Sequence, residues 1–410
     1  MSEQTGPLTE IRNFTEFLEQ HLNRKVLEYS LKALTKPGDN FGAVVQSVDV
    51  KVAGNDLSDE PEHLHVVVKT PVTSPYLAEL FKPAISFVKE VRFYSDIIPA
   101  VKQFEQTTNV PEDERLDAFI QSLGWRISLD PSAQSADSDA VLLLENVKLQ
   151  NFANGDKSIG FGRDEAMATL KALAKFHALC IAMRRLQPEL FNTKVNPYLL
   201  PLDATTKNDK QFESIYRELR LLDGLSPEMR NKIENVTRNG KEYNEILTRA
   251  PDSPYTTVVH KDLWINNIMT KRDATPTKVK IYDFQSFYFE SFMHDLIFFL
   301  FTSVQNSDLK SNFKSLIDHY LAEFRKTMDF FKCPLDDYTS EKMWSEIRDK
   351  AHILLFRLLI RAKVTKANHD STPQLHEVNK RNSPMERPAS KVVLDQWKFI
   401  IDMFIENAFI

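Results

Sequence analysis

The first third of the chain alternates between helical and strand-like spacing of its apolar residues. Residues 10–35 carry apolar side chains along one helical stripe, which predicts a helix. Residues 37–52 then place valines at even positions, with Gln46 as the exception, and this period of two predicts a strand. The polar stretch 53–62 reads as a hairpin loop, and the short β-branched segment 64–70 as a second strand, central in its sheet.

The pattern becomes mainly helical farther along the chain. A helix is predicted over 83–97, followed by strands at 124–130 and at the strongly apolar segment 141–146. Residues 164–186 have clear helical periodicity, and most of the remaining chain is also helical in pattern. The exception is 254–287, where strand and turn signals return.

This order predicts an α+β chain of two domains. A strand-rich domain is expected over 1–145 and a mainly helical domain over 146–410, each long enough to bury a core of its own. The hydrophobic fraction of 42% and the charged fraction of 27% are typical of a globular protein.

Charge and cysteine content limit the functional classes. A net charge of −5 argues against a nucleic-acid partner, which would favour a basic surface. Cys180 and Cys333 are the only cysteines, so neither a disulfide framework nor a cysteine zinc site is expected. The N-terminus is polar, and the longest strongly apolar run, 296–301, is too short to cross a bilayer. We therefore expect a cytoplasmic protein without a membrane partner, and a monomer.

Phenylalanine is abundant, with 28 residues, whereas glycine occurs only 10 times. The simpler interpretation is that the rings fill a helical core, and the alternative is that some line an apolar substrate pocket.

The segment 258–287 carries the strongest chemical signal. It holds Asp262, then Asn267 five residues later, then a polar hairpin and a strand that ends at Asp283. Phosphoryl transfer from ATP needs oxygen ligands for magnesium and a carboxylate beside the attacking hydroxyl, and these three residues supply them. The alternative is a surface loop that contains Asp and Asn by chance.

This spacing, with His260 two residues before Asp262, resembles the catalytic loop of the protein-kinase-like superfamily. The resemblance implies a two-lobed fold, with an N-lobe built on an antiparallel sheet and a larger helical C-lobe. It makes Asp262 the catalytic base, and Asn267 and Asp283 the ligands of Mg²⁺. His260 is expected to brace the loop.

The first third offers a matching pair of charged residues. Lys69 ends an apolar strand, where a lone lysine is costly unless it is paired, and Glu90 lies on a helix that follows. In kinases such a lysine holds the ATP phosphates and such a glutamate orients it. Taken alone, a lysine at a strand end is more often a solvated edge residue, but the order of turn, strands, lysine, helix glutamate and later loop favours the paired interpretation.

Nucleotide contacts beyond this pair are expected by position rather than by motif. The turn that contains Gly38, Asn40 and Gly42 is placed at the phosphates, although it lacks the usual glycine-rich pattern and a two-glycine turn between helix and strand is most often only a turn. Glu145 and Val147 are placed at a hinge whose backbone would bind adenine.

Two further segments have open interpretations. Asp295 precedes a very apolar helix, so it is either a helix cap or, as in kinases, a support for the catalytic-loop backbone. The polar segment 368–390 reads as a disordered loop or as a lid.

The motif HKDLWINNIM followed by VKIYDFQ resembles the insect ecdysteroid-kinase-like family, which is related to choline kinases and aminoglycoside phosphotransferases. FVKEVRFYSDIIP, LLLENV, LKALAKFHA and DLIFFLFTS match the family in the same order along nearly the whole chain. The resemblance implies transfer of the γ-phosphoryl group of ATP to a hydroxyl of a small-molecule alcohol, and ecdysteroids and related sterols are the apolar acceptors that it suggests.

Three alternatives accompany this expectation. A choline-type or aminoglycoside-type kinase would take a cationic alcohol, for which Glu290 and Trp264 are candidate contacts. A pseudokinase would bind a ligand or partner without turnover. A protein kinase is disfavoured, because Asp-Phe-Gln replaces Asp-Phe-Gly and little room follows for an activation loop.

The chain departs from the family pattern at Lys261, where glycine is usual. Lysine adds a positive charge beside the proposed base and removes the backbone freedom of glycine. For an apolar acceptor, Phe287, Tyr288 and Phe289 are aromatic candidates, with the core as their other interpretation.

Overall fold

The computed structural model describes residues 10–34, 42–54, 60–72, 74–200, 209–238, 253–366, 378–379 and 387–410. The chain forms two compact units. The first comprises 1–95, 119–151 and 368–383, and the second comprises 96–118, 152–367 and 384–410. Each unit is thus made of three segments, whereas the boundary expected after residue 145 treats each domain as one continuous segment. That boundary stays a prediction.

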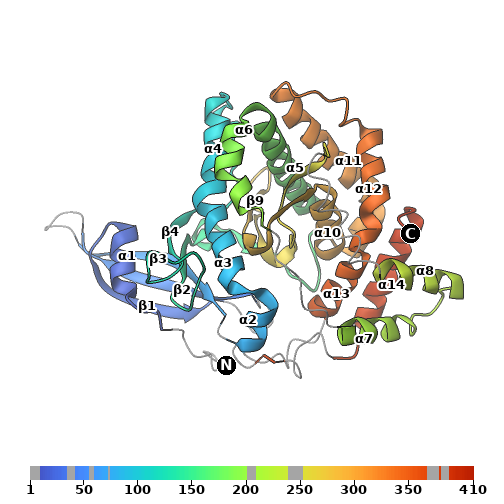
Figure 1. The fold of residues 1–410 in the computed structure, drawn as a ribbon, viewed down its shortest axis with the longest axis horizontal. Helices are drawn as coiled ribbons and strands as arrows, with labels where there is room; N and C mark the ends of the chain where they lie inside the picture. The colour runs from blue at the N-terminus through green and yellow to red at the C-terminus, as the bar shows by residue number, and fades with distance from the viewer. Residues whose placement is uncertain are drawn as a thin grey trace. The chain divides into compact units, whose positions relative to one another are not determined.

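The first unit is built on a five-stranded antiparallel sheet in the order β1-β2-β3-β5-β4 (Figure 1). Its strands are β1 (Val26–Ala33), β2 (Ala43–Val52), β3 (Glu62–Pro71), β4 (Ser122–Arg126) and β5 (Val141–Glu145). β3 is the middle strand, as its run of β-branched residues predicted. The expected hairpin is also present, with Val44 paired to Thr70 and Val52 to Glu62.

The core of this unit lies between the sheet and the helix α1 (Phe14–Leu22). The even positions of β2 supply Val48, Val50 and Val52, which are fully buried, as the period of two predicted. Phe14, Phe17 and Leu18 pack against this face.

The predicted helix over 10–35 is wrong in its second half. α1 ends at Leu22, and Asn23 takes a left-handed backbone conformation with φ of 51°. The chain then enters β1, whose backbone groups pair with β2. Because the strand needs its neighbour for these hydrogen bonds, the local helical spacing did not decide its structure.

The helices after β3 are α2 (Pro75–Phe81), α3 (Pro83–Arg92) and α4 (Ile98–Thr107), with the π-helical turn Phe93–Ile97 between the last two. The helix predicted over 83–97 is therefore present, and helical backbone continues ten residues beyond it.

The second unit is mainly helical, as expected. Besides α4, its longer helices are α5 (Arg163–Leu186), α6 (Pro188–Lys194), α7 (Asp209–Leu219), α8 (Pro227–Arg238), α10 (Met293–Ser303), α11 (Asn306–Phe330), α12 (Ser340–Lys350), α13 (Leu355–Thr365) and α14 (Lys391–Glu406). Short helical turns lie at Glu112–Glu114, Val147–Gln150, Asn196–Tyr198, Ile265–Asn267, Phe284–Ser286 and Ala351–Leu354, of which Val147–Gln150 belongs to the first unit.

Helices α5 and α11 lie side by side in this unit (Figure 1), and the apolar, largely buried α10 contacts both of them as well as α13. Phe298, Phe299 and Phe324 are among the fully buried rings, so much of the phenylalanine content fills the core. Among the described residues, α5 alone has the length and apolarity to cross a membrane. That is weak evidence for a span, because 78% of its most apolar window is buried within the fold, as in a core helix.

Two small sheets in this unit include strands of the segment 258–287. β7 (Thr256–Val259) pairs with β10 (Tyr288–Ser291), and β8 (Ile268–Lys271) lies between β6 (Ala153–Asn154) and β9 (Lys278–Ile281). All the pairings are antiparallel. The strand and turn signals predicted over 254–287 are confirmed, and so is the α+β fold class with its antiparallel sheet followed by a mainly helical region.

Candidate active site

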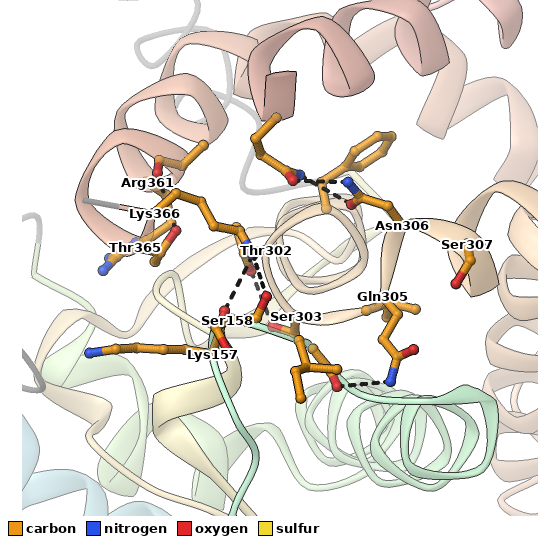
Figure 2. Close-up of a pocket in the computed structure, with 16 residues that line it drawn as sticks. Lys157, Ser158, Thr302, Ser303, Gln305, Asn306, Ser307, Arg361, Thr365 and Lys366 are labelled. Atoms are coloured by element: carbon orange, nitrogen blue, oxygen red, sulfur yellow. Dashed lines mark hydrogen bonds between the residues drawn. The ribbon is translucent and has the colours of Figure 1, made fainter. Parts of the chain in front are cut away.

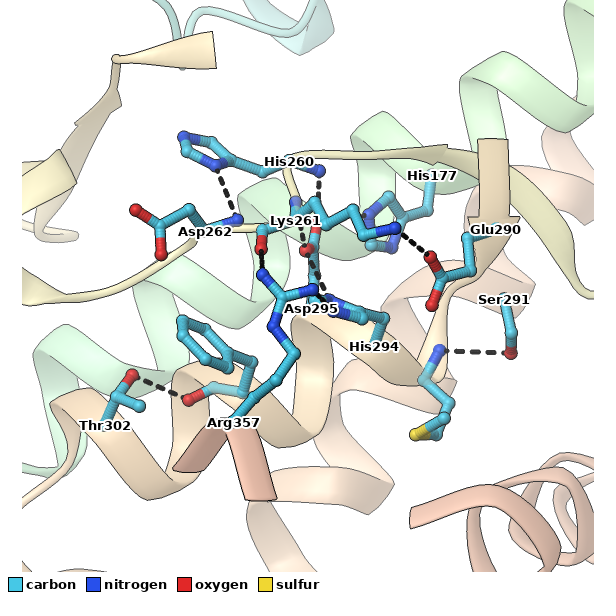
Figure 3. Close-up of polar contacts among 12 residues, drawn as sticks. His177, His260, Lys261, Asp262, Glu290, Ser291, His294, Asp295, Thr302 and Arg357 are labelled. Carbon is cyan, nitrogen blue, oxygen red and sulfur yellow. Dashed lines mark hydrogen bonds and ion pairs between the residues drawn. The ribbon is translucent and has the colours of Figure 1, made fainter. Parts of the chain in front are cut away.

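Asp295 holds the start of the catalytic loop (Figure 3). Its carboxylate accepts the backbone N–H of His260 at 2.5 Å and that of Lys261 at 2.8 Å. Asp295 is the third residue of α10, which is preceded by Phe292 at the cap position. Of the two interpretations of Asp295, support for the catalytic loop is therefore the one that the structure confirms.

Two further buried polar side chains are linked to Asp295. His177 of α5 approaches its carboxylate with Nε2 at 3.3 Å, and the Nδ1 of His177 lies 2.7 Å from the hydroxyl of Tyr320. Burial alone would raise the pKa of Asp295, but His177 and His294 beside it hold the pKa below its usual range. Asp295 therefore stays ionised, and its carboxylate anchors the two backbone N–H groups.

His260 braces the loop, as expected. Its Nδ1 accepts the backbone N–H of Asp262 at 3.2 Å, and its Nε2 lies 2.8 Å from the carbonyl oxygen of Tyr282. A neutral imidazole with its proton on Nε2 satisfies both contacts. The ring thus links the loop to the strand end that carries Asp283.

The β8–β9 hairpin brings Asn267 and Asp283 to the same end of one sheet. Ile268 pairs with Ile281, and the backbone N–H of Tyr282 donates to the carbonyl oxygen of Asn267 at 3.0 Å. The side-chain amide of Asn267 donates to the carbonyl oxygen of Asp262 at 2.9 Å, so its own oxygen is turned away from that bond. Antiparallel pairing therefore unites residues that lie 16 positions apart in sequence.

These groups fit a magnesium ion. Mg²⁺ is usually bound through one or two carboxylates together with substrate phosphates and water, and Asp283 with the amide oxygen of Asn267 would be its protein ligands here. Within the described parts of the chain, no cluster of three His, Cys, Asp or Glu side chains forms a closed metal cage. When bound, the ion would neutralise charge on the phosphates.

Asp262, the proposed base, is held by an arginine from a distant helix. Nη2 of Arg361 on α13 donates to Oδ1 of Asp262, and the two side chains are 22% and 20% exposed. The same guanidinium lies over the ring of Trp264, with Cζ 4.5 Å from the ring centroid. One carboxylate oxygen of the base is thereby fixed in direction, since a guanidinium holds an oxygen with directed N–H groups.

A second arginine of α13 supports the loop backbone (Figure 3). Arg357 lies four residues before Arg361, so both project from one face of the helix. Its Nη2 donates to the carbonyl oxygen of Lys261 at 3.1 Å, and its Nη1 lies 3.2 Å from Nε2 of His294. Burial lowers the pKa of Arg357, and nearby Asp262 and Glu290 counter this shift.

Lys261 occupies a left-handed backbone conformation, with φ of 69°. This is the conformation that glycine adopts readily, so the lysine carries a backbone cost at the position where the family pattern has glycine. The peptide groups on both sides are nevertheless held, by Asp295 and by Arg357.

The ammonium of Lys261 neutralises a buried carboxylate. Its Nζ lies 3.0 Å from Oε2 of Glu290, which is fully buried, and 5.0 Å from the ring centroid of Tyr288. Burial alone would raise the pKa of Glu290, but the Lys261 ammonium holds it below its ordinary value. Lys261 therefore points away from Asp262 and into its own unit (Figure 3).

Lys69 and Glu90 form a buried ion pair in the first unit. Nζ of Lys69 on β3 donates to Oε2 of Glu90 on α3 at 2.5 Å, and the two residues are 4% and 1% exposed. The interpretation of Lys69 as a solvated edge residue is therefore wrong. Its role at the ATP phosphates stays a prediction.

The other nucleotide contacts also stay predictions. Gly38 and Asn40 lie outside the described residues, whereas Gly42 directly precedes β2. Glu145 ends β5, and its carboxylate accepts the backbone N–H of Gln121 at 2.7 Å. Val147 is buried two residues later. The segment 368–390 lies outside the described residues except at 378–379 and 387–390.

The three aromatic candidates for an acceptor pocket have different surroundings. Phe287 is fully buried in the core, and Phe289 packs against Phe191 with ring centroids 5.9 Å apart. Tyr288 lies beneath the ammonium of Lys261.

Sequence reasoning missed Arg357 and Arg361. The signal that marks them is a pair of arginines four residues apart in LFRLLIRAKVT, a mainly apolar helix that would not bury cations without partners. Their partners lie between 63 and 99 positions earlier, so the sequence alone did not identify them.

Most of the chain matches one known protein family. The model of the Ecdysteroid kinase-like family matches residues 37–332. A comparison with curated proteins gave no match. Solved structures with partial likeness include an ethanolamine kinase of Plasmodium vivax, at 12% identity and a TM-score of 0.41, covering 95% of this chain and 86% of that one.

Two further solved structures have similar scores. A microcompartment-associated aminopropanol kinase has 10% identity and a TM-score of 0.43, with 96% and 99% of the two chains covered. An amicoumacin kinase, solved with AMP-PNP and Ca²⁺, has 13% identity and a TM-score of 0.42, with 91% and 88% covered. The family match spans most of the chain, including the catalytic segment, and this chain therefore belongs to the ecdysteroid kinase-like family of small-molecule kinases.

Proposed function

We propose that this protein transfers the γ-phosphoryl group of ATP, with Mg²⁺, to a hydroxyl of a small-molecule alcohol. Asp262 accepts the proton of the attacking hydroxyl, and Asn267 and Asp283 hold the metal. The observation that carries the proposal is the arrangement of the catalytic loop. Asp295, His260 and the β8–β9 hairpin place these three oxygen-bearing residues in one unit.

The contacts of the Asp262 carboxylate suit the role of a base. Arg361 donates to Oδ1 only, so Oδ2 is not used by that contact. A hydroxyl that donates to Oδ2 would have its oxygen directed for attack, while the proton passes to a carboxylate whose charge Arg361 balances. Proton transfer of this kind typically contributes on the order of 10²-fold to 10⁴-fold in rate.

We propose an ecdysteroid or a related sterol alcohol as the acceptor. The family membership of the chain supports this choice, and the surroundings of the base disfavour a cationic acceptor. Glu290 and Trp264, the two residues expected to contact a cationic alcohol, are already occupied by the protein's own cations, Lys261 and Arg361. A second positive charge would meet repulsion at both places.

The test uses purified protein, Mg·ATP and a panel of ecdysteroids, other sterols, choline and aminoglycosides. Mass spectrometry reads a mass gain of one phosphate. Asp262→Asn is expected to reduce product by at least about 100-fold, since it removes the base. Asp273→Asn, an exposed aspartate in the hairpin of the same segment, is the matched control and should retain full activity.

The outcomes separate the alternatives. A phosphorylated steroid made by the wild-type protein and lost in Asp262→Asn supports the reaction, the acceptor class and the base together. Phosphate on choline or an aminoglycoside alone would overturn the acceptor class and leave the kinase. Binding of Mg·ATP without transfer to any alcohol would favour a pseudokinase, and no binding of nucleotide would overturn the proposed activity.

A further inference from the structure

Arg361 has hydrogen-bonding capacity that its contact with Asp262 does not use. A guanidinium carries five N–H donors in a planar fork. Among the described residues, the only hydrogen bond of this side chain is the one from Nη2 to Asp262. Its faces pack on Trp264 and Phe298, with Cζ 4.5 Å and 5.7 Å from the ring centroids, and these contacts leave the edge of the fork for a ligand.

Arg361 also lines a cavity of about 250 Å³ within the second unit (Figure 2). The wall consists of the loop at Lys157 and Ser158, the junction of α10 and α11 from Thr302 to Asn306, and the end of α13 at Lys366. Three of the lining residues are cationic, several carry hydroxyl or amide groups, and no aspartate or glutamate occurs among the described residues that line it.

The cavity wall is held in place by its own hydrogen bonds. Nζ of Lys366 donates to the carbonyl oxygen of Ser158 at 3.0 Å, and the side-chain amides of Asn306 and Gln396 pair at 2.9 Å (Figure 2). Two of its sides are therefore fixed before a ligand enters, which lowers the entropy cost of binding.

Charge and size together define the ligand group. A cationic group would meet Arg361 and Lys366 without a compensating carboxylate in the lining. A guanidinium binds carboxylate, sulfate and phosphate groups through paired N–H donors. Pockets for whole ligands usually measure about 300–1,000 Å³, so a cavity of this size accommodates a substituent rather than a steroid nucleus.

We infer that this cavity is an oxyanion subsite, in which Arg361 binds a carboxylate, sulfate or phosphate group of the acceptor while it holds Asp262. The inference rests on the proposed function and narrows its substrate class to an acidic alcohol, such as a hydroxylated steroid acid or sulfate. It makes Arg361 a specificity-determining residue, because the same side chain contacts both the base and the cavity.

The first experiment measures anion binding without turnover. The protein is labelled with 5-fluorotryptophan, and the resonance of Trp264 is assigned with Trp264→Phe. Sodium sulfate is titrated in the absence of nucleotide, against sodium chloride of equal ionic strength. A saturable shift of the Trp264 resonance is expected with sulfate only, because Trp264 packs on the guanidinium.

Two variants test the site, with one control. Arg361→Gln should abolish the saturable shift, and Lys366→Gln, at the end of the same helix, should weaken sulfate binding by about tenfold. Lys310→Gln, an exposed lysine of α11 outside the cavity lining, should behave as the wild-type protein does. A shift that does not saturate, or one that is unchanged in both cavity variants, would overturn the inference. Lys366→Gln keeps the test decisive if Arg361→Gln does not fold.

The second experiment separates this inference from the proposed function. A hydroxylated steroid carboxylic acid and its carboxamide are compared as acceptors with Mg·ATP. The acid should have at least about a tenfold higher kcat/KM, and Arg361→Gln should remove this preference. Equal turnover of the two by the wild-type protein would overturn the oxyanion subsite and leave the kinase. Sulfate binding at Arg361, with no phosphate transfer and no nucleotide binding, would overturn the proposed function and leave the anion site.

Discussion

Replacing Lys261 by glycine, the residue usual at this place in the family, is expected to destabilise this protein. The change removes the ammonium that pairs with Glu290, whose carboxylate is fully buried. It also relieves a backbone cost, since Lys261 has φ of 69°. The two effects have opposite signs, and their magnitudes decide the outcome.

The loss of the ion pair is the larger effect. Removing one partner of a buried pair costs about 3–5 kcal/mol, because an uncompensated charge stays buried. Glycine returns about 1 kcal/mol by adopting the left-handed conformation without strain. The net expectation for Lys261→Gly is a loss of about 2–4 kcal/mol in the free energy of unfolding. Lys261→Ala should lose about 1 kcal/mol more, because alanine keeps the strain.

The assay is urea unfolding of the second unit, followed by tryptophan fluorescence. Trp264, Trp344 and Trp397 all lie in that unit, and Trp125 is the one tryptophan of the first. A Trp125→Phe background therefore makes the signal report the second unit alone. Glu290→Gln, alone and combined with Lys261→Gly, completes a double-mutant cycle that isolates the pair.

The pH dependence follows from the lowered pKa of Glu290 in the folded state. A lowered pKa contributes stability above the ordinary glutamate value of about 4.3, and this contribution is lost as pH falls through the folded value. In Lys261→Gly, burial without a partner raises the pKa, so the variant should be closer to the wild-type protein at pH 5 than at pH 8. A glycine variant as stable as the wild-type protein at pH 8 would refute the reasoning. Equal stability of the alanine and glycine variants would show that residue 261 carries no backbone strain.

Three more outcomes are expected. Glu90→Gln should lower kcat/KM for ATP by about 10-fold to 100-fold, because a charge-assisted bond to Lys69 of about 1.5–3 kcal/mol is lost, with little change in KM for the alcohol. Asp283→Asn should raise the Mg²⁺ concentration needed for half-maximal activity, and an unchanged metal titration would contradict its assignment as a ligand. Asp295→Ala should lower the free energy of unfolding by about 3 kcal/mol or more, since two backbone N–H groups lose their acceptor. The same N–H groups should then exchange with solvent faster. Hydrogen-exchange protection equal to that of the wild-type protein would contradict the role of Asp295 as an anchor.

Local pattern sufficed for most of the secondary structure and for the hairpin that brings Asn267 and Asp283 together. The period of two in β2, the β-branched run in β3 and the long helix α5 were all predicted, because each depends on residues close in sequence. The spacing of Asp262, Asn267 and Asp283 was enough to identify the loop, since the β8–β9 hairpin that unites them is itself local. β1 was the exception, because it is a strand only through its pairing with β2.

The tertiary structure decided which charges meet. Arg361 reaches Asp262 across 99 positions and Asp295 reaches His260 across 35, and no sequence spacing specifies such contacts. The sequence also did not determine the direction of the Lys261 side chain. This side chain points to Glu290 because β10 pairs with β7 and brings that buried carboxylate beneath the loop. The sequence by itself determined the types and the order of the residues proposed for catalysis. Packing of α10 and α13 around the loop determined their orientation and the charge that surrounds the base, because burying a charge requires a partner that only the folded chain supplies.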